Sequence, residues 1–483
     1  MGELGVAVPP PAAPADLVAA WPAMCPPVRQ RYAATGQPHR ARAFALRWLA
    51  WEAKRRARQR ERGGSTATLG AEMSVLAIRP DHLGDALLAT PAFRLLKQAL
   101  PTARLTVLCG PWGADVPVHC PAVDRVETAA FPGFARAEGR DRLPPAFARL
   151  RRQLAPYAWS LGLAGVLAEG RYDVAVNFRP DYWLGAALSA LASIPYRLGY
   201  DHPEARPFLT DALPHQRLPV GKLLSSIAIE HAAARNLALV ERVLQLAGRE
   251  PPGAFDSGMQ YVPTAGERAE AARLWRAHDL DEAPAVVAIH PVPGEPAKRW
   301  PAARFALVAD HLAGRFGARV VVTGASGDVA EARALVDRCH YRPVFLAGHT
   351  SFGVLATLLE RCRFALGTDN GAMHLASAMG TPNVRLFGPT AAAAWGPWPA
   401  EDPSVPSKVA LSLPKGQALG ADEASAWKIL SPRPCAPCHR LDLPPWEVAS
   451  ATNDPAYPCM DEISVEQVIF AIETMWEKTA SRA

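Results

Sequence analysis

The chain has 483 residues, 49% of them hydrophobic and 20% charged, which is enough length and apolar content for two domains with separate cores. No apolar run approaches the length of a membrane span, and the N-terminus lacks the basic and apolar regions of a signal peptide. The eight cysteines are scattered, which excludes a secreted disulfide framework and leaves a cytoplasmic enzyme as the expected class.

The net charge of +6 is concentrated in one stretch of the chain. Residues 40–62 hold nine Lys or Arg against two Glu, a local net charge of +7, so the rest of the chain is about neutral. This distribution excludes a general nucleic-acid-binding protein, and we expect no nucleic-acid partner.

Residues 1–72 are predicted to be an N-terminal extension. The part before residue 39 is rich in Pro and Ala and is expected to be largely disordered. Residues 40–62 are predicted to form a basic amphipathic helix, in which Phe44, Trp48 and Trp51 share one face. Such a helix either lies on an anionic membrane surface or packs its aromatic side chains on the protein body. A nucleic-acid-binding arm is a weaker third alternative.

Apolar strands alternate with helix-forming stretches through the rest of the chain, which predicts an α/β fold with parallel sheets covered by helices. A loop-rich stretch over residues 251–258 is the expected boundary between two similar halves. We therefore predict domains over 73–255 and 256–462, followed by a C-terminal helix over 463–483. The predicted strands are 75–79, 105–108, 173–177, 285–290, 319–324, 344–346, 364–366 and 383–387.

A polar turn over residues 367–374 follows one of these strands and opens a short helix of small residues. Asn370 is a candidate N-cap, and Gly371 lets another group approach the backbone closely. Unpaired N–H groups at the helix start, beside the carboxylate of Asp369, suit an anionic ligand such as a diphosphate. The alternative is an ordinary connection between a strand and a capped helix.

Two more loops at strand ends carry charged residues. In the first half, Asp85 follows a Gly at the start of a helix, where its carboxylate either caps the helix or acts as a general base. Asp81, nearer the middle of the same loop, is a second candidate base. In the second half, Lys298 lies in a Pro-rich loop and could neutralise phosphate, or could simply be solvated.

Together these loops resemble glycosyltransferase family 9, the heptosyltransferase family of bacterial lipopolysaccharide core assembly. The resemblance covers roughly residues 74–478. Each motif is short, but their number, order and spacing make the match specific. The principal motifs are Arg79-x-x-x-x-Gly84-Asp85, Lys298-x-Trp300 and Gly367-x-Asp369-x-Gly371-x-x-His374-Leu375.

The resemblance implies a GT-B fold, in which two Rossmann-like domains face a central cleft and a C-terminal helix crosses back to the first domain. It also implies an inverting transfer of a sugar, heptose from ADP-heptose, to a hydroxyl of a lipopolysaccharide-type or other cell-surface glycan. Such an enzyme would act at the cytoplasmic face of the inner membrane. No cofactor or metal is expected to be obligatory, because basic groups can meet the charge of the leaving diphosphate.

The resemblance also implies roles for individual residues. Asp85 would be the catalytic base, Lys298 would bind the donor phosphate, and Asp369 would contact the sugar hydroxyls. The acceptor-side residues would be Arg79, Asp81 and Gly84. The other donor-binding residues would be Thr323, Gly324, Asp328 near the ribose, Asn370, Gly371 and Ala372 through their N–H groups, and His374, which lines the pocket or braces the loop.

Some features stay open. Asn370 stands where the family more often has Thr or Ser, which leaves the donor preference undecided. Cys435, Cys438 and Cys459 could be zinc ligands, a redox-labile disulfide or reduced packing residues. Two other functions are compatible with the same residues: a non-catalytic nucleotide-sugar-binding protein, and a GT-B nucleotide-sugar epimerase or hydrolase.

Overall fold

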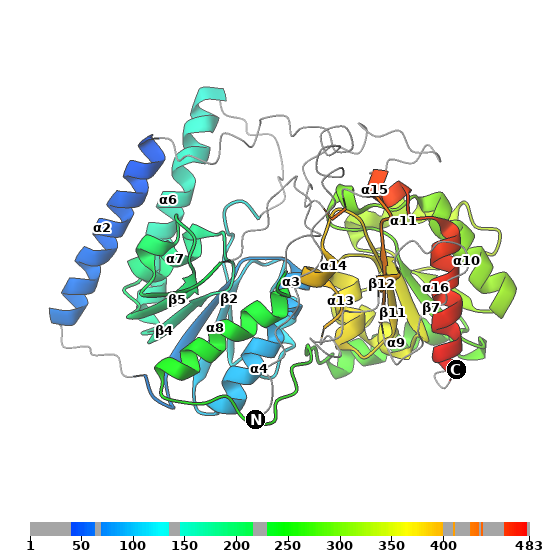
Figure 1. The fold of residues 1–483 in the computed structure, drawn as a ribbon, viewed down its shortest axis with the longest axis horizontal. Coiled ribbons are helices and arrows are strands. Elements are labelled where there is room, and N and C mark those ends of the chain that lie inside the picture. The colour runs from blue at the N-terminus through cyan, green and yellow to red at the C-terminus, as the bar shows by residue number, and fades with distance from the viewer. Residues whose placement is uncertain are drawn as a thin grey trace, which may run out of the picture. The chain divides into compact units, whose positions relative to one another are not determined.

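The computed structural model describes residues 40–62, 69–134, 145–215, 229–398, 409–410, 426–433, 436–437 and 458–480. The described chain divides into two compact units (Figure 1). The N-terminal unit contains the described residues up to 215 together with 233–257, and the C-terminal unit contains 229–232 and the described residues from 258 onward. None of the described helices is long and apolar enough to cross a membrane.

The N-terminal unit is built on a sheet of six parallel strands in the order β3-β2-β1-β4-β5-β6 (Figure 1). A β-strand turns alternate side chains to opposite faces, and both faces of this sheet are buried. In β1, Val75 and Ala77 pack with α4 and α8, whereas Leu76 and Ile78 belong to the core formed with α2, α6 and α7. The strands are β1 (Ser74–Arg79), β2 (Arg104–Cys109), β3 (Arg125–Thr128), β4 (Val174–Asn177), β5 (Tyr196–Tyr200) and β6 (Asp211–Leu213).

The helices of this unit cover the two faces of the sheet; α2 precedes the first strand, α8 follows the last, and the others lie between strands in the chain. They are α2 (Arg40–Arg62), α3 (Leu83–Leu87), α4 (Thr90–Ala99), α5 (Asp115–Val118), α6 (Pro145–Glu169), α7 (Trp183–Leu191) and α8 (Ala232–Leu246), with a 3-10 turn, η2, at Arg206–Phe208.

The C-terminal unit repeats this design with seven parallel strands in the order β12-β13-β11-β10-β7-β8-β9. The strands are β7 (Val286–His290), β8 (Arg319–Val322), β9 (Val344–Phe345), β10 (Phe364–Thr368), β11 (Asn383–Phe387), β12 (Val409–Ala410) and β13 (Ala426–Leu430). The α-helices are α9 (Ala265–Ala277), α10 (Ala302–Phe316), α11 (Val329–Val336), α12 (Phe352–Arg361), α13 (Gly371–Ala378), α14 (Ala392–Trp395), α15 (Pro458–Asp461) and α16 (Val465–Lys478). The 3-10 turns are η3 (Leu280–Glu282), η4 (Pro296–Lys298) and η5 (Ser326–Asp328).

The predicted helix over residues 40–62 is α2, and its packing decides between two of the interpretations above. Phe44, Trp48 and Trp51 are 72%, 43% and 59% exposed, so they do not pack on the protein body. Leu49 of the same helix is fully buried instead. The alternative in which α2 buries its aromatic side chains on the protein is therefore wrong.

The predicted C-terminal helix is α16, which begins at Val465. Ser464 and Gln467 form the expected capping box at the start of α16. Val468, Ile472 and Met475 are buried in the core of the C-terminal unit, and α16 packs against α10 and β13. The apolar face of α16 therefore packs within its own unit, and the predicted crossing back to the first domain stays a prediction.

The cysteine cluster predicted near the C-terminus is described only in part. Cys435 and Cys438 lie outside the described residues. Cys459 lies in α15, where it is buried in the core of the C-terminal unit.

Candidate active site

In both units, the candidate residues lie where the strand order reverses. If the strands of each unit are numbered from one and β12 is left out, both sheets have the strand order 3-2-1-4-5-6. β12 lies at one edge of the second sheet, beside β13. In open parallel sheets, ligands bind beyond the carboxyl ends of the strands at this switch point. It lies between β1 and β4 in the N-terminal unit and between β7 and β10 in the C-terminal unit.

Lys298 and Asp369 meet at the C-terminal switch point. The Lys298 ammonium lies 3.0 Å from Asp369 Oδ2 and 3.0 Å from the Asp369 carbonyl oxygen, and it donates a hydrogen bond to each. An ammonium has three N–H donors, so the two bonds to Asp369 leave one donor for a ligand. The neighbouring Arg299 pairs instead with Glu331, so the two adjacent basic residues have different partners.

The Asp369 carboxylate is buried, with its side chain 5% exposed. Burial by itself would raise its pKa, but the charge of Lys298 and the hydrogen bonds from Lys298 and Thr390 outweigh it, so the pKa is lowered. The Thr390 hydroxyl donates to Asp369 Oδ2 over 2.9 Å. Asp369 is therefore an ionised, fixed hydrogen-bond acceptor at neutral pH.

Asn370 is the N-cap of α13, as predicted. Its Oδ1 accepts a hydrogen bond from the Met373 N–H over 3.1 Å, which leaves the N–H groups of Gly371 and Ala372 without an intrahelical acceptor. Its Nδ2 is buried and has no hydrogen-bond partner among the described residues. The start of α13 therefore offers three N–H donors, two from the backbone and one side-chain amide, beside Lys298 and Asp369.

His374 and Arg385 brace this turn from inside the unit. Arg385 is fully buried on β11 and donates to His374 Nδ1 over 3.2 Å and to the Met373 carbonyl over 2.6 Å. Because Nδ1 accepts, the ring proton of His374 is on Nε2, 3.9 Å from Asp369 Oδ1. Burial lowers the pKa of His374 well below its usual value and that of Arg385 to about 9, so at neutral pH His374 is neutral and Arg385 is charged.

Arg385 was not among the residues predicted from the sequence. An arginine inside the otherwise apolar run 384–387 was the signal that could have identified it, because a buried cation in a central strand needs specific partners.

The remaining donor-side candidates lie beyond the end of β8. The Thr323 hydroxyl is buried and lies 2.9 Å from His290 Nδ1, and Asp328 Oδ2 accepts a hydrogen bond from the Ala325 N–H over 2.9 Å. A side chain at Gly324 would approach the Cβ atoms of Asp328 and Ala347 within 3.2 and 3.3 Å. These contacts shape the loop, and the carboxylate of Asp328 is used at least in part to hold it.

At the N-terminal switch point, two arginines hold the loop that follows β1. Asp81 is completely buried, 3.2 Å from Arg79 Nε and 2.5 Å from an Arg179 nitrogen. Arg79 also donates to the Phe178 carbonyl over 2.9 Å, which ties the ends of β1 and β4 together. Asp81 is therefore a structural anion and a poor candidate for a base that must meet a substrate hydroxyl.

Asp85 lies in the first turn of α3, where its side chain is 34% exposed. His82 is the N-cap residue of α3 and Asp85 is the third residue of the helix, so Asp85 is not itself the N-cap. Gly84 is helical rather than part of a separate tight turn. One Asp85 oxygen lies 3.4 Å from Arg79, which links the exposed carboxylate to the buried network.

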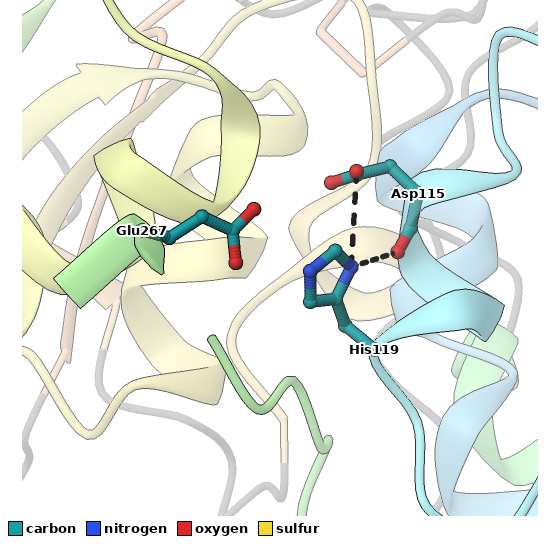
Figure 2. A group of neighbouring side chains, drawn as sticks. All are labelled: Asp115, His119 and Glu267. Atoms are coloured by element: carbon teal, nitrogen blue, oxygen red, sulfur yellow. Dashed lines mark hydrogen bonds and ion pairs between the residues drawn. The ribbon is translucent and has the colours of Figure 1, made fainter. Parts of the chain in front are cut away.

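A third group of polar side chains has local roles. The N–H at His119 Nδ1 donates to the Asp115 carbonyl over 2.7 Å at the end of α5 (Figure 2). Glu267, which the same figure draws, belongs to the C-terminal unit and forms the capping box of α9 with Thr264.

Comparison with known proteins identifies the family. The model of glycosyltransferase family 9 (heptosyltransferase) matches residues 161–412, more than half of the chain. The chain belongs to glycosyltransferase family 9. Among curated relatives of this family 9 protein, lipopolysaccharide heptosyltransferase 3 of Escherichia coli is 27% identical over 65% of this chain and 83% of its own. Lipopolysaccharide heptosyltransferase 2 of Salmonella typhimurium is 25% identical over 66% and 83%.

Solved structures of similar proteins show the GT-B fold. The glycosyltransferase family 9 protein of Veillonella parvula has a TM-score of 0.59 and 23% identity, over 84% of this chain and 97% of its own. The E. coli ADP-heptose lipopolysaccharide heptosyltransferase II has a TM-score of 0.57 and 18% identity, over 84% and 99%. This chain is therefore a family 9 glycosyltransferase of GT-B fold, with candidate residues at the switch point of each domain.

Proposed function

We propose that this glycosyltransferase moves heptose from ADP-heptose to a hydroxyl of a lipopolysaccharide-type glycan, with inversion at the anomeric carbon. The relatives support this choice, because the matched curated proteins are lipopolysaccharide or lipooligosaccharide heptosyltransferases. A structurally similar enzyme, the E. coli heptosyltransferase WaaC, has been crystallised with ADP, at a TM-score of 0.51 and 18% identity.

The observation that carries the proposal is the group of donors around Lys298 and the start of α13. When the glycosidic bond to the donor breaks, negative charge develops on the departing diphosphate. The remaining Lys298 N–H and the N–H groups of Gly371 and Ala372 would bind these oxygens without a large rearrangement, because all three are already held in place. Asp369, kept ionised by Lys298, would accept hydrogen bonds from sugar hydroxyls.

The acceptor would be activated by Asp85. A general base must reach the proton that it removes, and the Asp85 side chain is 34% exposed, whereas Asp81 is completely buried. Arg79 contacts both carboxylates and would orient Asp85 toward the acceptor hydroxyl. Gly84 would keep the approach to this carboxylate free of a side chain.

The reaction is proposed to take place in the cytoplasm, at the inner face of an anionic membrane that carries the glycolipid acceptor. Residues 40–62 would provide the peripheral contact, through their basic and aromatic side chains.

The decisive experiment compares Asp85→Asn with Asp115→Asn. Both carboxylates lie in the first turn of a short helix of the same unit, with 34% and 40% of the side chain exposed. Asp85→Asn is expected to lower the rate of transfer by about 100- to 10,000-fold. The variant protein should still bind ADP-heptose nearly as well as the wild type. Asp115→Asn is expected to retain transfer.

Transfer and donor binding would be measured by mass spectrometry of the products and by calorimetry. Retained turnover in Asp85→Asn would remove Asp85 from the role of base. Consumption of ADP-heptose by the wild type at the same rate with and without glycolipid would instead identify a hydrolase or an epimerase. Binding without any turnover would identify a non-catalytic protein.

A further inference from the structure

We infer that α2 is a membrane-inserting helix whose two faces have separate tasks: one docks on the N-terminal unit, and the other enters the headgroup region of an anionic bilayer. This inference deepens the membrane location proposed above and rests on it, but it does not depend on which sugar is transferred. The described residues of α2 carry the argument by their exposure, spacing and charge.

The docking face is formed by Leu49, Glu52 and Ala53, which are at most 6% exposed. Leu49 and Ala53 join the core that α2 shares with α7. Arg56 adds a hydrogen bond of 3.4 Å to the Leu191 carbonyl at the end of α7. The helix is therefore fixed to the unit and not merely tethered to it.

Another face of α2 exposes three large aromatic side chains. At about 100° of rotation per residue, Phe44, Trp48 and Trp51 fall within a narrow stripe that points away from Leu49. They are 72%, 43% and 59% exposed, although a docked helix of this kind would normally bury its aromatic residues. Their exposure means that the fold leaves this apolar surface for something outside the unit.

Basic residues flank the aromatic stripe. The same helical rotation places Arg47, Lys54 and Arg58 beside it, and all three are exposed. Glu52 is turned away and held by hydrogen bonds of 2.7 and 2.8 Å from Arg55 and Arg56. The outward surface thus combines aromatic rings with a strong excess of positive charge.

An anionic lipid surface fits this combination better than the other possible partners. Trp and Phe favour the membrane interface, and each nearby Lys or Arg adds attraction to anionic headgroups. A second copy of the same face would bring like charges together, which opposes a symmetric dimer through α2. Since α2 is already folded and docked, binding to lipid would not have to offset the entropy of ordering a helix.

The test uses the full-length protein and flotation on phosphatidylcholine vesicles with and without phosphatidylglycerol. The wild type is expected to float with the anionic vesicles. With the neutral vesicles it should stay in the bottom fraction, and its binding to the anionic vesicles should weaken as the salt concentration rises. Trp48→Ser with Trp51→Ser is expected to lower the partition coefficient about ten-fold or more, because two exposed rings no longer leave water. The matched control, Leu307→Ser with Phe470→Ser, removes exposed apolar side chains of the C-terminal unit and should float like the wild type.

A second pair of variants tests the charge. Arg47→Gln with Lys54→Gln is expected to weaken binding by about five-fold for each charge removed. Arg104→Gln with Arg319→Gln removes two exposed basic residues outside α2 and should have no such effect. Circular dichroism and thermal melting would verify that every variant is folded, which is expected because the substituted side chains are exposed.

Several results would overturn the inference. It fails if the wild type does not float on anionic vesicles, or if the control pairs lose as much binding as the α2 pairs. Sedimentation without lipid could show a dimer that becomes a monomer in Trp48→Ser with Trp51→Ser. This result would assign the aromatic face to contact with a second copy of the chain. Tighter binding to RNA than to vesicles would assign it to nucleic acid.

A separate assay distinguishes failure of this inference from failure of the proposed function. Transfer to a water-soluble, delipidated acceptor should be unchanged in the α2 variants, because α2 contributes nothing to the reacting groups. Loss of flotation with this transfer intact would leave the glycosyltransferase proposal standing. Flotation without any transfer would leave the membrane contact standing and remove the proposed reaction.

Discussion

The two switch points share one backbone design but treat their carboxylates in opposite ways. In the N-terminal unit, Asp85 is 34% exposed and lies 3.4 Å from Arg79 of the buried network. In the C-terminal unit, Asp369 is buried and in direct contact with Lys298 at 3.0 Å. The difference suits a proton acceptor that must meet substrate on one side and a fixed, always ionised acceptor on the other. The fold places a site, and the side chains around each carboxylate decide its chemistry.

The largest effect on donor binding is expected from removing Lys298, whose ammonium contacts Asp369 in the C-terminal site. Lys298→Met should weaken donor binding by about 100-fold or more, because a charged hydrogen bond to the diphosphate is lost. It should also destabilise the protein by about 2–4 kcal/mol, because Asp369 is left buried without its cation.

The double variant Lys298→Met with Asp369→Asn separates these two effects. Removing the buried charge should restore most of the stability without restoring donor binding. Calorimetry with ADP-heptose and chemical denaturation would measure both quantities. Unchanged donor affinity in Lys298→Met would contradict the phosphate contact.

A comparison of two buried arginines would show whether the two sites act independently. Arg385→Met removes the donor of the hydrogen bonds to Met373 and His374 and should cost about 2–3 kcal/mol of stability, with weaker donor binding. Arg79→Met loosens the contact with Asp85 and should lower the turnover rate about ten-fold while donor binding is retained. Equal effects of both variants on donor affinity would mean that the two sites do not act independently.

Acid is expected to destabilise the C-terminal unit through His290. Burial lowers the pKa of His290 from 6.5 to about 4, so as the pH falls the unfolded chain takes up this proton before the folded one. The free energy of unfolding should therefore decrease between pH 6.5 and 4, by at most about 3 kcal/mol from this group. His290→Gln, which can still bond Thr323, should show a shallower decrease in denaturation experiments across this range. Equal slopes in both proteins would argue against the effect.

The smallest effect is expected at Asn370, where the substitution tests a single contact between the side-chain amide and the donor. Asn370→Asp retains an N-cap oxygen but replaces the unpartnered Nδ2 donor with negative charge, so KM for the donor should rise about ten-fold with little change in melting temperature. Asn370→Ser keeps the cap without adding charge and should affect KM less. Neither variant has an Nδ2, so KM values equal to that of the wild type in both would mean that Nδ2 does not face the donor.

Much of the fold could be predicted because it depends on local sequence patterns. The apolar strands β1, β7, β10 and β11 were expected from their composition, since strands of a parallel sheet are buried on both faces. Strands β3, β5, β6, β12 and β13 were not predicted. β3 is largely exposed, and β5 and β6 include polar or aromatic residues that do not form a simple apolar run.

In the candidate site, too, the features that depend on local sequence could be predicted and the features that depend on distant residues could not. Asn370 as a helix cap and the capping box of Ser464 follow from residue types a few positions apart, so the sequence by itself determined them. Arg385 beneath α13, Arg179 on Asp81 and the outward face of α2 depend on residues that are distant in the chain. Only the tertiary structure decided these contacts, because burial and ion pairing are set by which elements pack together, and that information is absent from any short window of sequence.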